Sequence, residues 1–306
     1  MHNMPLVSIV IPVYNGANYV KEAIDAALAQ TYTNIEVVVV NDGSVDDGAT
    51  EKVCLAYGDK IQYYKKENGG CASAINYGIS MAKGEYISWL SHDDLYDPNK
   101  LETQISFYET YGLDRENTII SNTGRLIDEN GNTFYHPGVK GQKRLFSKDM
   151  FRYLLFKKCF NGCGLLIPKN LFEKADYFRE DMRFVLDWNL WLKFAIADAS
   201  VFIDDAVLVS NRRHSGQVTV KQKQLHQTEA IMTCEELFEQ LAKLEKWDFL
   251  LELYYFCYAT NKAVTPQILN CLKEHHVPIN GFCKIKHRGK MVLRRMLKKV
   301  YHAVKR

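Results

Sequence analysis

The chain has 306 residues, a formal net charge of +3, and 47% hydrophobic and 25% charged residues. These proportions are typical of a globular protein with a hydrophobic core and exclude a disordered, collagen-like or low-complexity chain. The sequence has no run of about 20 consecutive apolar residues, so no transmembrane helix is expected. No basic segment precedes the first apolar run, so no signal peptide is expected either.

Charge is unevenly distributed along the chain. Residues 284–306 contain ten Lys or Arg and no acid, whereas residues 1–283 hold 29 Lys or Arg and 36 Asp or Glu. An acidic body with a basic tail argues against nucleic acid as a partner, because a general nucleic-acid binder carries basic charge over its body. The eight cysteines form no C-x-x-C pair, which favours reduced thiols in a cytoplasmic protein.

The first 111 residues alternate strand and helix patterns. Apolar, β-branched runs predict strands, and apolar residues at helical spacing predict helices between them. The strands are expected over 6–14, 35–43, 61–65 and 85–94, and the helices over 18–30, 49–57, 72–82 and 98–111. This alternation indicates right-handed βαβ connections and a mainly parallel sheet, which defines an α/β fold.

The order of elements is looser further along the chain. Strands are predicted over 118–127, 164–167 and 200–210, a turn at Asn130-Gly131, and a helix over 187–197. Beyond residue 219 the patterns are helical only. We expect one long or one broken helix over 224–258 and further helices over 264–276 and 290–304. We therefore place a domain boundary near residue 218.

The predicted strand ends carry polar motifs. In an open α/β sheet, ligands bind beyond the carboxyl ends of the strands, where this chain has PVYNG (12–16), NDGS (41–44), ENGG (67–70) and HDD (92–94). The sequence lacks the G-x-G-x-x-G of a dinucleotide dehydrogenase and the G-x-x-x-x-G-K-[ST] of a P-loop ATPase. Acidic strand ends without a phosphate-binding lysine suggest instead a divalent cation that neutralises a diphosphate. The alternative for Asp93-Asp94 is helix capping before Pro98.

Residues 7–48, VSIVIPVYNGANYVKEAIDAALAQTYTNIEVVVVNDGSVDDG, resemble the opening of the family 2 glycosyltransferases of GT-A fold, of the kind that build bacterial surface polysaccharides. Later motifs follow in that family's order: NGGCASAINYGISMAKGEYISWLSHDD (68–94), NGCGLLI (161–167), LDWNLWLK (186–193) and NRRH (211–214). The resemblance covers about residues 1–218. It implies a GT-A catalytic domain over 1–218, with a nucleotide-binding half (1–112) and an acceptor-binding half (113–218). A helical C-terminal region would follow over 219–306.

The resemblance implies a nucleotide site. Pro12 and Tyr14 match positions that line the base, with the tyrosine ring free to stack on it. Asp42 matches the acid that accepts the N3–H of a pyrimidine, although an Asp before Gly is also a common turn residue. Asn68 and Gly69 match the loop beside the nucleotide.

The same resemblance implies a metal site and a catalytic base. Asp93 would reach the ribose, and Asp94 would bind the cation, Mn²⁺ or Mg²⁺. His214, preceded by Arg212-Arg213, would complete the shell around metal and diphosphate. Asp187 matches the base, since an inverting transfer needs one carboxylate to deprotonate the acceptor hydroxyl. Asp187 could also cap the helix over 187–197, and the two roles are compatible.

Three features depart from the family's pattern. Leu186 precedes the base where a polar residue is common. Ile75 stands where an arginine is common, so a basic contact to the nucleotide is missing or supplied elsewhere. The segment 90–92 lacks the acid often found before the Asp pair.

The expected function is metal-dependent, inverting sugar transfer from a nucleotide-diphosphate donor, a UDP-sugar, to a glycan or lipid-linked saccharide. The alternatives are a sugar nucleotidyltransferase, which would need a basic glycine-rich loop that PVYNG does not provide, and a non-catalytic GT-A-like scaffold. The segment 291–304 repeats apolar residues at helical spacing between Lys and Arg residues. It predicts a basic amphipathic helix that binds an anionic membrane, with the protein peripheral on the cytoplasmic face. The alternative is packing of this helix on the body or on a second copy of the chain.

Overall fold

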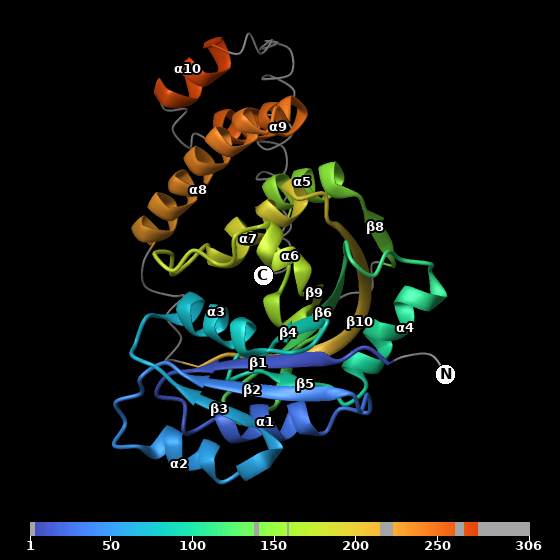
Figure 1. Ribbon diagram of the computed structural model, residues 1–306, viewed down its shortest axis with the longest axis vertical. Helices are drawn as coiled ribbons and strands as arrows, with labels where there is room; N and C mark the ends of the chain where they lie inside the picture. The colour runs from blue at the N-terminus through green and yellow to red at the C-terminus, as the bar shows by residue number, and fades with distance from the viewer. Residues whose placement is uncertain (1–3, 138–140, 158, 215–222, 261–265, 275–306) are drawn as a thin grey trace, which may run out of the picture. The chain divides into compact units, whose positions relative to one another are not determined.

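The computed structural model describes residues 4–137, 141–157, 159–214, 223–260 and 266–274 (Figure 1). The chain forms two compact units, which are described separately below. The first comprises residues 1–150 and 159–221, and the second comprises residues 151–158 and 222–306. The predicted helix over 290–304 lies outside the described residues, and so do the membrane and second-copy contacts expected of it.

The first unit is built on a 10-stranded mixed sheet with the order β3-β2-β1-β4-β9-β6-β10-β5, in which β7 pairs with β6 and β8 pairs with β10. Its strands are β1 (Val7–Val13), β2 (Ile35–Asn41), β3 (Gln62–Lys65), β4 (Tyr86–Trp89), β5 (Leu95–Tyr96), β6 (Thr118–Ile127), β7 (Thr133–Tyr135), β8 (Lys143–Leu145), β9 (Leu165–Pro168) and β10 (Ser200–Arg212). Its helices are α1 (Val20–Leu28), α2 (Ala49–Leu55), α3 (Cys71–Met81), α4 (Lys100–Thr110), α6 (Asn170–Lys174) and α7 (Leu186–Ile196), and α5 (Ser147–Phe156) begins in this unit.

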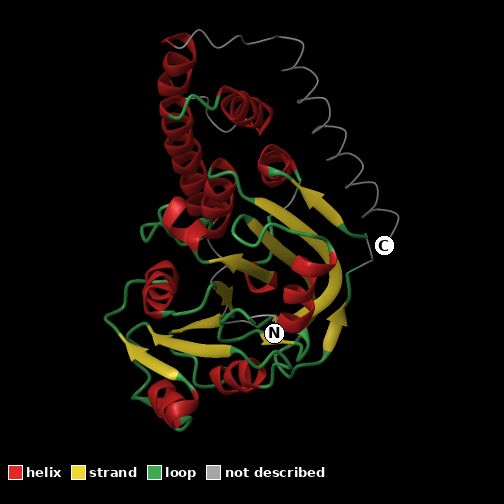
Figure 2. Cartoon of the chain, turned by 45° about the vertical axis from the view of Figure 1, so that its right-hand side comes forward, coloured by secondary structure: helices red, strands yellow, loops and turns green. Residues whose placement is uncertain are grey.

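The N-terminal half of the sheet is parallel, as predicted. Strand β1 pairs in parallel with both β2 and β4, and β2 pairs with β3. Helices cover both faces of these strands (Figures 1 and 2), which explains their uninterrupted apolar runs. Ile9 and Ile11 of β1 belong to the same core cluster as Ile24 of α1. Val10, which points to the opposite face, meets α3 at Gly78, where a Cβ atom would lie only 2.4 Å from Val10 Cγ1.

The C-terminal half of the sheet is mixed. Strand β9 runs antiparallel between β4 and β6, whereas the long strands β6 and β10 are parallel to each other. The strand expected over 85–94 ends at Trp89. Beyond it the chain turns, and the Asp94 N–H donates to the Ser91 carbonyl at 3.1 Å. The HDD motif therefore lies in a turn at the end of β4. Strands β5, β7 and β8 and helix α6 were not predicted, because each is only two to five residues long. Helix α5 was also not predicted, although its buried residues Met150, Phe151, Leu154 and Leu155 recur at helical spacing.

The second unit is helical over its described residues. It contains α8 (Lys223–Lys243), α9 (Trp247–Thr260), α10 (Pro266–Glu274) and residues of α5. The helix expected over 224–258 is broken, because Glu245 adopts a positive φ of 54°. Within the described ranges, every helix is too short or too polar to cross a membrane.

Candidate active site

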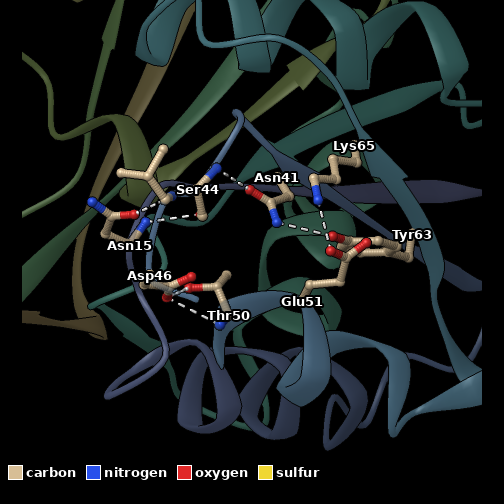
Figure 3. Close-up of polar contacts among 9 residues, drawn as sticks. Asn15, Asn41, Ser44, Asp46, Thr50, Glu51, Tyr63 and Lys65 are labelled. Carbon is tan, nitrogen blue, oxygen red and sulfur yellow. Dashed lines mark hydrogen bonds and ion pairs between the residues drawn. The ribbon is translucent and has the colours of Figure 1, made fainter. Parts of the chain in front are cut away.

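Two loops at the carboxyl ends of β1 and β2 are hydrogen-bonded to each other (Figure 3). The Asn15 N–H donates to Ser44 Oγ, and the Val45 N–H donates to Asn15 Oδ1, each at 2.9 Å. The Ser44 N–H in turn donates to Asn41 Oδ1 at 2.9 Å. Asn15 has a φ of 49°, a left-handed conformation that asparagine tolerates better than most residues. The polar motifs after β1 and β2 thus fix each other and form one edge of the site.

Asp42 is enclosed by the glycine loop that precedes α3. Its carboxylate is 4% exposed and accepts hydrogen bonds from the Gly69 N–H (3.0 Å) and the Gly70 N–H (2.7 Å). The Asn68 side-chain amide donates to the Asp42 carbonyl at 2.9 Å. Gly70 has a φ of 90°, which only glycine adopts without strain. The structure therefore brings together three residues predicted for the nucleotide site: Asp42, Asn68 and Gly69.

The two residues predicted to line the base lie directly beside Asp42. The Asp42 N–H donates to the carbonyl of Val13 at 2.9 Å, between Pro12 and Tyr14 in the chain. Pro12 is buried within β1, whereas Tyr14, just beyond the strand, is 43% exposed. The tyrosine ring is accessible and the proline forms part of the sheet beneath it.

Lys66 is a site residue that the sequence analysis missed. Its ammonium group lies 3.0 Å from Asp42 Oδ1 and 2.6 Å from the Glu67 carbonyl, and its side chain is 20% exposed. Ile75, which replaces the family's arginine, is fully buried in α3. The neighbouring Lys65 instead pairs with Glu51 at 2.7 Å (Figure 3). Lys66 follows Lys65, the last residue of β3, and precedes the glycine loop. This pair of lysines was the signal in the sequence, because the isoleucine at position 75 meant that a basic contact to the nucleotide had to come from another segment.

Asp93 and His214 face each other across 121 positions of sequence. His214 Nε2 lies 3.1 Å from Asp93 Oδ2, and their side chains are 17% and 13% exposed. The ring of Tyr19, at the start of α1, lies 5.1 Å from the His214 ring, centroid to centroid. The two side chains that the resemblance placed near metal and ribose are thus adjacent and partly accessible.

Asp94 is more deeply enclosed than Asp93. It is 7% exposed, and its Oδ1 accepts the Arg212 backbone N–H at 2.9 Å. Its Oδ2 accepts the Asn211 side-chain amide at 2.8 Å and the Cys163 thiol at 3.2 Å. Burial and the neighbouring charge of Asp93 raise the pKa of Asp94 to about 6. The HDD, NGCG and NRRH motifs converge on this carboxylate.

Asp187 lies in the first turn of α7, and its Oδ1 accepts the Trp188 backbone N–H at 2.7 Å. Its Oδ2 accepts the Cys159 thiol at 3.5 Å. The side chain is half-buried, and a helix N-terminus favours its ionised form. The helix begins at Leu186 with Val185 at its N-cap position, so the prediction that Asp187 could cap this helix is wrong. An acid in the first turn of a helix is still placed where it could act as a base.

Three of the predicted site acids influence the titration of Cys71, the first residue of α3. Local desolvation of the thiol, followed by the charges of Asp42, Asp187 and Asp93, raises the pKa of Cys71 to about 12. The charges of three acids from separate segments of the chain thus all act on the first residue of α3.

The sequence profile of the family described as "Glycosyl transferase family 2" matches residues 8–174, more than half of the chain. The chain belongs to this family. It is 44% identical over 290 residues to a glycosyltransferase of Rickettsia typhi, covering 91% of this chain and 88% of that protein. A Rickettsia bellii glycosyltransferase is 51% identical over 217 residues, which cover 71% of this chain. The match spans only 31% of that relative's length.

The fold of this family 2 member also matches a solved structure. TarS of S. aureus, residues 1–349 in complex with UDP-GlcNAc, superposes with a TM-score of 0.64 at 17% sequence identity. The match covers 89% of this chain and 81% of TarS 1–349. The GT-A architecture expected from the motif order is therefore confirmed.

Proposed function

We propose that the protein is a metal-dependent, inverting glycosyltransferase that moves a sugar from a UDP-sugar to a hydroxyl of a glycan or lipid-linked saccharide. The observation that carries this proposal is the placement of three predicted acids: Asp42 accepts hydrogen bonds from the glycine loop before α3, Asp93 lies 3.1 Å from His214, and Asp187 lies in the first turn of α7. These acids have separate tasks: recognition of the base, binding of a cation and removal of a proton. The UDP-GlcNAc held by TarS, which shares the fold, supports a uridine donor.

The base would be recognised at Asp42. A carboxylate has about four lone-pair sites, and three here accept Gly69, Gly70 and Lys66. The remaining site on Oδ2 suits the N3–H of uracil, with the ring stacked on Tyr14. Lys66 lies beside this acceptor and can donate to a neighbouring carbonyl of the base. This acceptor–donor pair matches uracil and not cytosine, whose N3 is itself an acceptor.

Asp93 and His214 suit a divalent cation. Mg²⁺ is usually bound by one or two carboxylates together with substrate phosphates, and imidazole suits several transition metals. Among the described residues, no three His, Cys, Asp or Glu side chains form a cluster that could hold a metal alone. Diphosphate oxygens and water would therefore complete the shell. When bound, the cation stabilises the charge that develops on the departing diphosphate.

The geometry supports a different assignment within the acidic pair. The partly accessible Asp93 faces His214, whereas Asp94 binds Asn211, Arg212 and Cys163 inside the protein. We therefore propose Asp93 as the carboxylate ligand and Asp94 as the group that holds the end of β10 against the HDD turn.

Asp187 would be the base. The acceptor hydroxyl loses its proton to the Asp187 carboxylate as its oxygen attacks the anomeric carbon from the face opposite the diphosphate. This single displacement forms no covalent enzyme intermediate, so one carboxylate is sufficient. The N-terminus of α7 favours the ionised state that a base requires.

Nucleotide binding with and without metal tests the proposal. Purified protein is heated with UDP, GDP, UDP-sugars or GDP-sugars, each with Mn²⁺ or with chelator. A ligand at a hundredfold its Kd stabilises the folded state by about 2.7 kcal/mol. UDP compounds with Mn²⁺ should give the largest shift, and release of UDP from one donor should follow the same dependence. Stronger stabilisation by GDP, or none by any nucleotide, would contradict the donor assignment.

We also propose that the basic segment 284–306 brings the enzyme to an anionic membrane. Each cation near such a surface contributes about 1 kcal/mol. The full chain should sediment with anionic liposomes at low salt and be released at high salt, whereas a chain ending at Phe282 should stay in solution. Equal behaviour of the two chains would exclude this role and leave packing on the body or on a second copy.

A further inference from the structure

Arg212, the last residue of β10, holds the HDD turn at two points. Its Nε–H donates to the Asp93 carbonyl at 3.0 Å, and its backbone N–H donates to Asp94 Oδ1 at 2.9 Å. The residue is only 1% exposed. One arginine therefore fixes the backbone of the first acid and the carboxylate of the second.

The other guanidinium nitrogens bind segments distant in sequence. Nη2 donates to Glu22 Oε2 of α1 at 2.7 Å, and Nη1 donates to the Glu129 carbonyl in the β6–β7 turn at 3.0 Å. All three nitrogens of the buried group thus face protein. Arg212 is therefore not positioned as a diphosphate contact, although the NRRH motif suggested a basic group there. The exposed Arg213 remains accessible.

Arg212 is connected to His214 through an aromatic ring. The guanidinium carbon lies 4.6 Å from the centroid of the Tyr19 ring, within the range of a cation–π contact. The same ring lies 5.1 Å from the His214 ring at an interplanar angle of 47°. Tyr19 thus contacts both the arginine and the histidine.

We infer that Arg212 is a positioning residue for the cation site, oriented by Glu22. It fixes Asp93 through the backbone carbonyl and His214 through Tyr19, and contacts no ligand itself. The planar fork of arginine serves three acceptors at fixed angles, which lysine cannot reproduce. The inference rests on the proposed function in one respect, that Asp93 and His214 bind the cation. Its most specific consequence is that Glu22, a 49% exposed residue of α1, controls cation affinity.

The test compares two acids of α1. Glu22→Gln removes the negative charge that faces the Arg212 guanidinium, and Asp25→Asn removes a similar charge. Asp25 is 50% exposed and pairs with Lys21 at 2.7 Å, the same length as the Glu22–Arg212 pair. Arg212→Lys completes the set. Bound Mn²⁺ is counted by electron paramagnetic resonance with saturating UDP, and UDP affinity is measured separately in chelator.

We expect Arg212→Lys to weaken Mn²⁺ binding about 10- to 100-fold, the usual cost of losing an outer-shell partner, and Glu22→Gln, which acts through Arg212, to weaken it about tenfold, the low end of that range. UDP affinity in chelator should be unchanged, because the base is bound at Asp42, and Asp25→Asn should match the wild type in both measurements. If Arg212→Lys does not fold, Glu22→Gln still decides, since its side chain is half exposed.

Unchanged Mn²⁺ affinity in Glu22→Gln would overturn the inference, and so would an equal loss in Asp25→Asn, which would indicate a general charge effect. Both outcomes leave the proposed function intact. If the wild type itself bound no Mn²⁺ with UDP, the proposed cation site would fail, and the inference with it.

Discussion

The proposed base end of the site, around Asp42, and its proposed cation end, around Asp93 and His214, are assembled over very different sequence distances. Asp42 is held by Lys66, Gly69 and Gly70, which are 24 to 28 positions away. Asp93 lies against His214, 121 positions away, and Arg212 binds Glu22 across 190 positions. The base end is therefore complete within the parallel β1–β4 half of the sheet. The cation end forms only when the end of β10 packs against the HDD turn.

This difference predicts which substitutions act locally and which affect folding. Changes at the base end should alter nucleotide affinity and leave the remainder of the protein intact. At the cation end, changes to Arg212 or Asp94 should also lower stability, since these two residues join α1, the HDD turn and β10.

The largest effect is expected at Asp187, which belongs to neither end. Asp187→Asn should lower the rate of transfer by about 10²- to 10⁴-fold, the usual cost of losing a general base. Binding of UDP and Mn²⁺ should persist, because neither end is altered. Asp181→Asn is a suitable control, since Asp181 precedes α7 and pairs with Arg179 at 2.6 Å. Near wild-type transfer by Asp187→Asn would assign the base to another residue.

The next largest effect separates the two acids of the pair. Asp94→Ala should lower the free energy of unfolding, because each buried donor left unpaired costs about 1–3 kcal/mol, and Asn211 and Arg212 both donate to it. Asp93→Ala should unfold near the wild-type urea concentration and lose Mn²⁺-dependent UDP binding. The opposite pattern, a stable Asp94→Ala that binds no Mn²⁺, would restore the assignment that the sequence resemblance implied.

The same difference in sequence distance explains how much the sequence could predict. Apolar periodicity located β1, β2, β6 and α7 to within a residue or two, because these elements are buried along their length. The motif order indicated the fold and placed Asp42 beside the glycine loop. The inward direction of Arg212 and the enclosure of Asp94 could not be predicted, because both depend on tertiary contacts between distant segments. Lys66 was not predicted because the family pattern places its basic residue at position 75, which is isoleucine in this chain.

A smaller effect tests the base end. Lys66→Met should weaken UDP binding in chelator by about tenfold or more, since hydrogen bonds to charged groups contribute about 1.5–3 kcal/mol. Lys65→Met removes the adjacent lysine, which pairs with Glu51 and is 48% exposed, and should leave UDP affinity unchanged. Titration calorimetry with UDP and CDP checks both, and Lys66→Met should also lose preference for UDP. Equal affinities of the two variants would exclude Lys66 from base recognition.

The smallest effect concerns a buried lysine, Lys100, at the start of α4. Lys100 is fully buried, and its ammonium group donates to Ser88 Oγ and Gln104 Oε1, both at 2.9 Å. It also lies 4.1 Å from the centroid of the Tyr96 ring. Burial lowers the pKa of Lys100 from 10.5 to about 7, and the nearby Cys163 opposes this shift. The amine of Lys100 is therefore easily deprotonated in the folded state.

The sign of the resulting pH dependence follows from the direction of this shift. Between about pH 7 and the ordinary pKa of lysine, the unfolded chain binds a proton that the folded chain has lost, so the free energy of unfolding rises with pH. Below that window both states are protonated, and Lys100 contributes no slope. The slope from one group is at most about 1.4 kcal/mol per pH unit. Urea unfolding of wild type and Lys100→Met at several pH values measures it. The variant should show the smaller rise above about pH 7. Equal slopes would mean that Lys100 remains protonated in the folded protein, its charge stabilised by Ser88, Gln104 and the Tyr96 ring despite burial.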